Sequence, residues 1–341
     1  MGNTGGAPRI FRPIDLGGGV QIAVPVILAP MSGVTDLPFR RIARRLGAGL
    51  VVSEMIASWA LLRENRNTRR MAELDEGVSA IQLAGCEPEA MAEAARIAAG
   101  SGAAIVDINF GCPVKKVAMG QHAGSALMRD ETLAGRILEA VVRASAVPVT
   151  VKMRLGWDHA ALNAPAIARI AEAAGVRMLT VHGRTRQMFY TGHADWEAVH
   201  AVKEATGLPV IVNGDIAGEQ DAAEALARSG AGGVMIGRGA CGRPWLLGQV
   251  AHFLATGERL PEPLLPEKRR IVLGHYEAIL SMFGTDAGLR LARKHLCWYA
   301  HGLPGAAEFR ATVNRMTDPA AVVALIRRFF SGDAAGLERA A

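Results

Sequence analysis

Four short apolar runs decide the fold of this chain: VTVKM (149–153), MLTVH (178–182), VIVN (210–213) and GVMIG (233–237). Each is nearly all apolar and often β-branched, as expected of a strand that is buried on both faces of a parallel sheet. Segments of helical period separate them, among them 164–174 and 219–228. Earlier in the chain, runs of the same kind occupy 24–29, 50–54, 80–83 and 104–109, with helical segments at 37–46, 88–99 and 130–144. The sequence therefore predicts eight strands that alternate with helices.

Eight βα units over about 215 residues match the ordinary size of a TIM barrel, typically ~250 residues. A doubly wound open sheet would give the same local pattern. The count of eight favours the barrel, and so does the lack of a G-x-G-x-x-G motif after the first strand. We therefore expect an α/β fold, a (β/α)₈ TIM barrel followed by a small all-α C-terminal domain.

The predicted barrel domain spans 1–255. Residues 10–22, interrupted by three glycines, are typical of a short hairpin that closes the bottom of the barrel. A Pro-rich linker is expected at 256–266, and a helical domain at 267–341, with helices at 267–283, 288–301 and 319–330. Residues 261–341 carry 11 Lys/Arg against 8 Asp/Glu, which is a net +3 out of +6 for the whole chain. The predicted C-terminal domain is thus denser in positive charge.

The composition indicates a cytoplasmic protein and, weakly, an anionic partner. The formal charge is +6 and the pI about 9.4, but many basic enzymes bind no polyanion. No two of the cysteines have metal-ligand spacing, so we expect neither a zinc nor an iron–sulfur site. The first residues lack a signal-peptide pattern, and no apolar run approaches the ~20 residues that span a membrane. The cysteines are Cys86, Cys112, Cys241 and Cys297.

Polar residues follow the predicted strands where each run ends. In a TIM barrel the carboxyl ends of the strands form one mouth, and active sites lie there. Packing does not explain such a ring, because branched apolar residues otherwise fill the barrel. The ring consists of Ser32, Glu54, Gln82, Asn109, Lys152, His182, Asn213 and Arg238.

The types of residue in this ring suggest what it binds. Gly214, Gly237 and Arg238 follow strands seven and eight, the usual place for a phosphate in this fold, although the glycines alone would also suit tight turns. Lys152 offers a fixed positive charge beside a ring that gains negative charge on reduction, as a flavin does. The alternative is a rim lysine paired with a carboxylate. Gln82 has a donor and an acceptor, which suits the pyrimidine edge of a flavin.

Cys112 lies in the loop after the fourth strand, between Asn109 and Pro113. A single cysteine is most often an inert buried residue. However, a thiol with an ordinary pKa of about 8.5 is mostly protonated at pH 7. Cys112 is therefore a candidate proton donor or a nucleophile.

A series of motifs follows the predicted elements in order: APMSGVTDLPFR, AIQLAG, DINFGCPVKKV, AGSALM, VKMRLGW, LTVHGRTR, VIVNGDI, MIGRGACGRPW and RLARKHLCWY. Together they resemble the successive motifs of the tRNA-dihydrouridine synthases, and within that family those of the bacterial B-type branch. The resemblance runs from Pro25 to Tyr299 without a departure at the motif positions.

This resemblance implies an oxidoreductase that binds FMN and takes electrons from NADPH or NADH. In the family's mechanism, reduced FMN passes a hydride to C6 of a uridine in tRNA, and Cys112 protonates C5. The resemblance also places Asn109 and Lys116 at the substrate base. No obligatory protein partner is implied. The implied flavin-binding residues are Pro30, Met31, Ser32, Gln82, Lys152 and His182, with Asn213, Gly214, Asp215, Gly237 and Arg238 at the phosphate.

Basic residues are candidates for contacts to tRNA phosphates. Arg290, Arg293 and Lys294 recur at helical spacing beside Trp298 and Tyr299. The alternative for each is a solvated helix face. Further candidates are Arg63, Arg66, Arg69, Arg70, Lys115 and Lys116.

Three other functions fit parts of the pattern. The first is a flavin-dependent dehydrogenase of a free dihydropyrimidine, such as dihydroorotate. The second is a phosphate-binding barrel isomerase without flavin, and the third is an RNA-binding protein with an inactive barrel. The helical C-terminal region and the basic charge argue against the first, because a small substrate needs neither.

Overall fold

The structure, a computed structural model, describes residues 12–63 and 66–331. Within it the chain divides into two compact units. The first holds the described residues up to Gly239 together with Leu247–Arg259. The second holds Ala240–Leu246 and the described residues from Leu260 onward. In this part of the chain, no helix is long and apolar enough to cross a bilayer.

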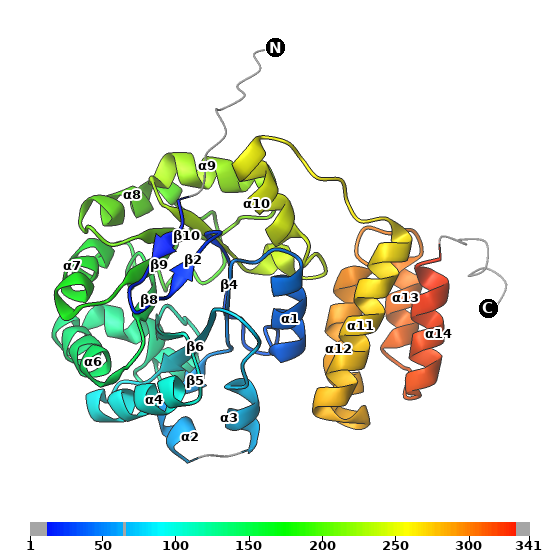
Figure 1. Cartoon of the computed structure of the whole chain (residues 1–341), viewed down its shortest axis with the longest axis horizontal. Coiled ribbons are helices and arrows are strands. Elements are labelled where there is room, and N and C mark those ends of the chain that lie inside the picture. The colour runs from blue at the N-terminus through cyan, green and yellow to red at the C-terminus, as the bar shows by residue number, and fades with distance from the viewer. Residues whose placement is uncertain (1–11, 64–65, 332–341) are drawn as a thin grey trace, which may run out of the picture. The chain divides into compact units, whose positions relative to one another are not determined.

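Parallel strands close into a barrel in the first unit (Figure 1). The strand order is β4-β3-β11-β10-β9-β8-β7-β6, and β4 pairs again with β6, which closes the ring. The predicted (β/α)₈ barrel is therefore confirmed over the open sheet. The strands are β3 (Val26–Leu28), β4 (Leu50–Val52), β6 (Ser79–Ala84), β7 (Ile105–Phe110), β8 (Val149–Arg154), β9 (Met178–His182), β10 (Val210–Asn213) and β11 (Gly233–Ile236), with a short β5 (Ile56–Ala57) beside β6.

Helices surround this ring of strands (Figure 1). Local signals in the sequence set several of their ends. The side chain of Asp36 caps the first helix by accepting from Phe39 N, and Gly175 and Gly230 end two others in the left-handed conformation. The outer helices are α1 (Leu37–Arg45), α4 (Pro88–Gly100), α6 (Glu131–Ala144), α7 (Ala164–Ala174), α8 (Trp196–Glu204), α9 (Glu219–Ser229) and α10 (Leu246–Thr256).

Short helical segments occupy the loops that follow the strands. Such loops lie at the carboxyl end of a barrel, where they shape the mouth. They are α2 (Ser58–Leu62), α3 (Arg66–Met71), α5 (Lys115–Ala118), η1 (Gly124–Arg129) and η2 (Arg238–Ala240).

An antiparallel hairpin, β1 (Ile14–Asp15) and β2 (Gln21–Ile22), fills the other end of the barrel. The side chains of Leu16 and Ile22 are almost fully buried. They belong to a core cluster with the first residues of several strands, such as Leu50 and Ile105. Of the predicted hairpin 10–22, residues 10 and 11 lie outside the described part of the chain. The hairpin thus covers the amino ends of the strands, opposite the mouth formed by their carboxyl ends.

The second unit is helical, as predicted for the C-terminal region. Its core includes Phe309, Phe329 and Phe330, whose rings contact one another. Two helices begin earlier than the sequence predicts, at 265 and 285, and the helix at 306–313 was not predicted. The elements are α11 (Leu265–Phe283), α12 (Thr285–Tyr299), α13 (Ala306–Val313) and α14 (Pro319–Phe329). Trp245, from the preceding segment, stacks on Tyr299 with ring centroids 6.4 Å apart.

Candidate active site

A buried hydrogen-bond network crosses β6, β7 and β8 inside the barrel. Gln82, Asp107 and Thr150 occupy one register row of the three strands. Gln82 Nε2 donates to Asp107 Oδ2 at 2.7 Å, and Thr150 Oγ1 donates to Asp107 Oδ1 at 2.6 Å. Asn109 Nδ2 donates to Gln82 Oε1 at 2.8 Å. The network fixes the orientation of the Gln82 and Asn109 amides, two of the predicted site residues.

Asp107 anchors this network, and sequence reasoning gave it no role. Its carboxyl is fully buried, and burial raises its pKa, against the hydrogen bonds from Thr150 and Gln82. The signal was present in the sequence, because Asp107 and Asn109 alternate within an otherwise apolar strand. Side chains two residues apart on a strand point to the same face. Asp107 therefore lies on the same face of the strand as Asn109, and the Gln82 amide links the two by hydrogen bonds.

Lys152 lies opposite Asn109, two register rows beyond Asp107 and Thr150 and on the same face of the sheet. Its ammonium group makes no ion pair within the described residues, which excludes the paired rim lysine considered above. Burial lowers its pKa to about 8, and the positive charge of Arg154 acts in the same direction. The carboxyl of Asp107 and the thiol of Cys112 act against this shift. Lys152 is thus a half-buried cation that an anionic ligand would stabilise.

The loop that carries Cys112 is held by hydrogen bonds on both sides. Asn109 Oδ1 accepts from Cys112 N at 2.8 Å, and Ser125 Oγ donates to Cys112 O at 2.8 Å. Gly124, in the left-handed region, packs so closely that a Cβ there would lie 3.0 Å from Cys112 Cβ. Burial raises the pKa of the Cys112 thiol. The thiol is therefore held in place and protonated at neutral pH, which suits a proton donor rather than a thiolate nucleophile.

Arg154 also holds the Cys112 loop, through a hydrogen bond to its backbone. Its Nε donates to Gly111 O at 2.8 Å, and its Nη1 donates to the carbonyls of Thr185 and Phe189 at 2.8 and 2.9 Å. The side chain is almost fully buried, and burial lowers its pKa to about 10. Arg154 thereby ties the Cys112 loop to the loop after β9. The sequence placed it at a strand end without giving it a role.

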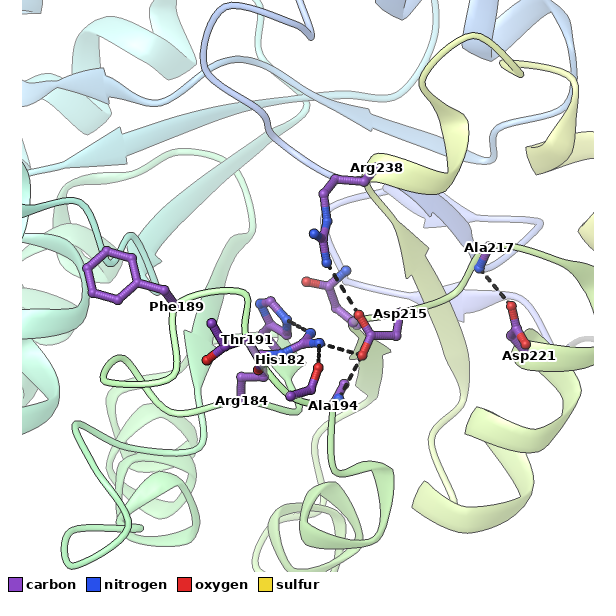
Figure 2. Close-up of polar contacts among 12 residues, drawn as sticks. His182, Arg184, Phe189, Thr191, Ala194, Asp215, Ala217, Asp221 and Arg238 are labelled. Carbon is purple, nitrogen blue, oxygen red and sulfur yellow. Dashed lines mark hydrogen bonds and ion pairs between the residues drawn. The ribbon is translucent and has the colours of Figure 1, made fainter. Parts of the chain in front are cut away.

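A second polar cluster lies on the β9–β11 side of the mouth (Figure 2). The Asp215 carboxylate lies between two guanidinium groups. Asp215 Oδ2 accepts from Arg184 Nη2 at 2.6 Å and from Ala194 N at 2.7 Å, and Asp215 Oδ1 accepts from Arg238 Nη2 at 3.3 Å. Burial acts to raise the pKa of Asp215, but these hydrogen bonds and the two positive charges outweigh it and lower the pKa.

Arg184 is the buried centre of this cluster, and it too was missed as a site residue. Its side chain is 1% exposed. Besides Asp215, it donates to the carbonyls of Thr191 at 3.0 Å and Gly192 at 2.7 Å. It therefore shapes the loop after β9. By contrast, the side chain of Arg238 is 61% exposed, and besides Asp215 its guanidinium lies 5.1 Å from the centroid of the Tyr190 ring.

His182 packs directly against the turn after β10. Gly214 has φ +115°, and a Cβ there would come within 2.7 Å of His182 Cδ2, so only glycine fits beside the imidazole. Burial, with the positive charges of Lys152 and Arg154, lowers the pKa of His182 well below its ordinary value. The imidazole is therefore neutral, and it lies 3.3 Å from Arg184 Nη1.

The remaining predicted flavin residues adjoin this turn. The Asn213 amide donates to Met235 O at 2.8 Å and links β10 to β11. A Cβ at Gly237 would lie 3.6 Å from Met31 Sδ, which brings the Pro30–Ser32 loop next to the end of β11. Met31 N donates to Thr35 Oγ1 at 2.9 Å, and Gly33 N donates to Glu54. The structure thus gathers the predicted flavin residues around one mouth.

The predicted RNA-contacting cations occupy different settings. Lys116 on α5 and Arg290 on α12 are exposed. Arg293 is half-buried, and its Nη2 donates to Met316 O at 3.0 Å. Lys294 is also half-buried. The three cations therefore differ in setting, since Arg293 bonds the turn after α13, and their contact with tRNA stays a prediction.

No group of three or more His, Cys, Asp or Glu side chains in residues 12–63 and 66–331 is arranged to hold a metal ion.

Comparison with known proteins gives a consistent result. Residues 27–332 match the family model described as "Dihydrouridine synthase (Dus)". The chain is 54% identical to a "Probable tRNA-dihydrouridine synthase" of Rickettsia conorii, over 92% of this chain and 96% of that protein. It is 56% identical to a protein of the same name from Rhodobacter capsulatus, over 92% and 96%. It is 52% identical to "tRNA-dihydrouridine synthase B" of Xanthomonas axonopodis, over 94% and 97%.

Proposed function

The chain belongs to the dihydrouridine synthase family, and from this premise we propose that it reduces the C5=C6 bond of specific uridines in cytoplasmic tRNA, with FMN as cofactor and NADPH or NADH as reductant. The observation that carries the proposal is the loop of Cys112. Asn109 and Ser125 hold its backbone by hydrogen bonds, Lys152 lies opposite Asn109 on the next strand, and the raised pKa of the thiol keeps it protonated. The comparisons give no support to the dehydrogenase of a free dihydropyrimidine, so that alternative is not retained.

The residues of the mouth fit FMN. Arg238 presents an exposed guanidinium beside the glycine turns at 214 and 237, which suits a single phosphate. Gln82 Nε2 uses one N–H on Asp107, so its second N–H is available to a pyrimidine carbonyl. Lys152 supplies a positive charge without a carboxylate partner in the described residues. The lack of a dinucleotide fingerprint favours FMN over FAD.

Asp215 acts in this scheme through its neighbours. Its carboxylate would repel a phosphate, but two guanidiniums and the Ala194 N–H already neutralise it. We therefore assign the Asp215 side chain to holding Arg238 in position, and only its backbone to direct phosphate contact.

The chain's own residues account for the protonation half of the reaction. When bound, the flavin supplies the hydride that C6 of the uracil ring accepts. The thiol of Cys112 donates its proton to C5, and the raised pKa keeps that proton on sulfur at neutral pH. Asn109 holds Cys112 through Oδ1 and bonds Gln82 through Nδ2, so it sets the distance between the proton donor and the position of the ring.

The substrate base must leave its stack to lie at such a mouth. Nucleotides in loops lose the least stacking energy when they are extruded, which favours a tRNA loop over a helix. Exposed cations such as Lys116 and Arg290 are suited to contact the backbone phosphates. In the second unit, α12 is the proposed site of further tRNA contacts.

Turnover on tRNA tests the proposal directly. The purified protein should be yellow and release FMN on denaturation. NADPH oxidation should accelerate when tRNA transcripts without modifications are added, and dihydrouridine should appear in the RNA by mass spectrometry. A protein that releases FAD would contradict the cofactor assignment. A protein that oxidises NADPH but leaves tRNA unchanged would contradict the substrate assignment.

A further inference from the structure

An arginine–tryptophan–arginine stack lies beside the loop that carries Cys112. The Arg129 guanidinium lies 4.9 Å from the centroid of the Trp157 ring, and the Arg186 guanidinium lies 4.5 Å from it. The three residues come from the loops after β7, β8 and β9. Backbone hydrogen bonds join the last two loops, because Arg186 N and Gln187 N donate to carbonyls of 156 and 157 at 2.9 Å.

Neither guanidinium of this stack has a carboxylate partner among the described residues. The nearest carboxylates in sequence are used elsewhere. Asp130 Oδ1 accepts from Leu133 N at 2.9 Å, and Glu131 Oε1 accepts from Asn163 Nδ2 at 2.8 Å. Two like charges around one ring repel each other, and an anion close to both would relieve that repulsion. The stack therefore has the charge and geometry of a phosphate-binding element.

A cavity of about 360 Å³ adjoins the stack, with Arg129 on its rim. This volume lies in the usual range for small-ligand sites and accommodates a nucleoside. Most of the lining is apolar, and its polar residues are His122, Arg129 and Asp130. The apolar lining residues are Ala118, Met119, Ala126, Leu127 and Leu133.

The wall of this cavity and the Cys112 loop are parts of one segment. Ala126, which lines the cavity, follows Ser125, whose hydroxyl bonds Cys112 O. Gly124, one residue earlier, packs on Cys112 Cβ. A ligand in the cavity would therefore contact the same segment that holds the Cys112 loop.

We propose that the Arg129–Trp157–Arg186 stack and the adjoining cavity bind the nucleotide of the RNA substrate that neighbours the target uridine. The base of that nucleotide enters the cavity against its apolar lining, and the phosphate lies against Arg129 and Arg186. This inference rests on the proposed function, since it requires an RNA substrate.

A matched pair of arginine variants tests the phosphate contact. Arg129→Ala removes a cation of the stack, whereas Arg136→Ala removes an exposed cation of α6 that does not line the cavity. Affinity of the full-length holoenzyme for a tRNA transcript is measured across a salt series. Arg129→Ala should lower the slope of log affinity against log salt by roughly 0.7–0.9. Arg136→Ala should match the wild type. Equal slopes for wild type and Arg129→Ala would overturn the phosphate contact.

A second pair tests entry of the base. Leu133→Trp fills the cavity and keeps both arginines, whereas Thr132→Trp adds the same ring at an exposed position off the cavity. Leu133→Trp should weaken tRNA binding by roughly 5- to 100-fold, the range for one lost stacked base, with the salt slope unchanged. FMN content and thermal unfolding report whether either variant folds. If Leu133→Trp folds and binds tRNA as tightly as Thr132→Trp, the base does not enter the cavity.

These outcomes separate the inference from the proposed function. Binding is measured without turnover, so the stack and the cavity are tested even if uridine reduction fails. A wild type that reduces tRNA while all four variants bind normally would overturn only the nucleotide site. A wild type that binds tRNA through Arg129 but forms no dihydrouridine would overturn only the proposed reaction.

Discussion

The two sides of the barrel mouth use polar residues in opposite ways. On the β6–β8 side, Gln82, Asn109 and Cys112 are neutral hydrogen-bonding groups, and the cation Lys152 has no ion-pair partner in the described residues. On the β9–β11 side, charges are paired, because Asp215 joins Arg184 and Arg238. On the β6–β8 side the charge of Lys152 is thus left for a ligand to neutralise. On the β9–β11 side the charge of Asp215 is already neutralised within the protein.

This difference indicates a division of labour. A site for proton transfer and for the edge of a ring needs dry, oriented, uncharged groups. A site for a phosphate needs donors that stay in place before the ligand arrives, and the Asp215 pair provides this by fixing Arg238. Disturbing the first side should therefore impair chemistry, whereas disturbing the second should impair stability and cofactor retention.

Replacement of the proton donor should give the largest effect. Cys112→Ala should slow uridine reduction by roughly 10²- to 10⁴-fold, the usual contribution of a general acid. FMN content and flavin reduction by NADPH should be unchanged, because Cys112 contacts neither Arg238 nor the turn at Gly214. Stopped-flow traces with NADPH and then with tRNA separate the two half-reactions. An unchanged rate with tRNA would remove Cys112 from the mechanism and with it the contrast between the two sides.

Lys152 is an exception on the β6–β8 side, because its replacement should raise the stability of the protein while weakening FMN binding. Burial lowers its pKa from 10.5 to about 8, so the unfolded chain holds the proton more tightly than the folded protein. The folded state is therefore penalised below pH 8, and this penalty disappears as the pH rises from 8 toward 10.5. Lys152→Met should stabilise the flavin-free protein at pH 7 by up to about 3 kcal/mol, while weakening FMN binding.

Urea unfolding of flavin-free wild type and Lys152→Met at neutral and alkaline pH measures this effect. The stability difference should shrink at alkaline pH. A variant that is less stable than the wild type at neutral pH would mean that Asp107 compensates for the burial of the Lys152 charge, and that both sides of the mouth are internally paired.

Asp215→Asn should have a smaller effect, on stability. The pKa of Asp215 is lowered, so its contribution to folding is present above the unfolded pKa of about 3.9 and is lost as the pH falls through the folded pKa. The variant should lose about 2 kcal/mol at neutral pH, because Arg184 stays buried without a countercharge although Asn still accepts a hydrogen bond. The free energies of unfolding of the wild type and the variant should converge as the pH falls through the lowered pKa of Asp215. A stability difference that does not depend on pH would contradict a charged Asp215.

The sequence predicted most reliably those features that depend on the residue type alone. The buried apolar runs identified the barrel strands, and the motifs identified the family, including its resemblance to the B-type relatives. The polar residues around the mouth could also be predicted, because each follows an apolar strand at the point where that strand ends. Their assignment to flavin or substrate stays a prediction.

The supporting residues were not predictable, since their roles depend on partners distant in sequence. Asp107 bonds Thr150 and Gln82, and Arg154 bonds carbonyls at 111, 185 and 189. Periodicity places such residues on a face but does not say which carbonyl they reach. For the same reason Arg293 was grouped with Arg290, although its guanidinium contacts Met316.

The distinction between a paired and an exposed cation extends to α12 and gives the smallest expected effects. Arg293 resembles Arg184, because its guanidinium donates to a backbone carbonyl, whereas Arg290 resembles the exposed Arg238. Arg290→Ala should lower the salt slope of tRNA binding by roughly 0.7–0.9 and leave thermal unfolding unchanged. Arg293→Ala should lower the free energy of unfolding by about 1 kcal/mol through the lost hydrogen bond, with little change in slope. Binding titrations across a salt series, paired with melting curves, distinguish the two.

If Arg290→Ala leaves the slope unchanged, the exposed face of α12 is only solvated and tRNA contacts lie elsewhere. If Arg293→Ala alone changes the slope, its guanidinium must leave Met316 to reach a phosphate.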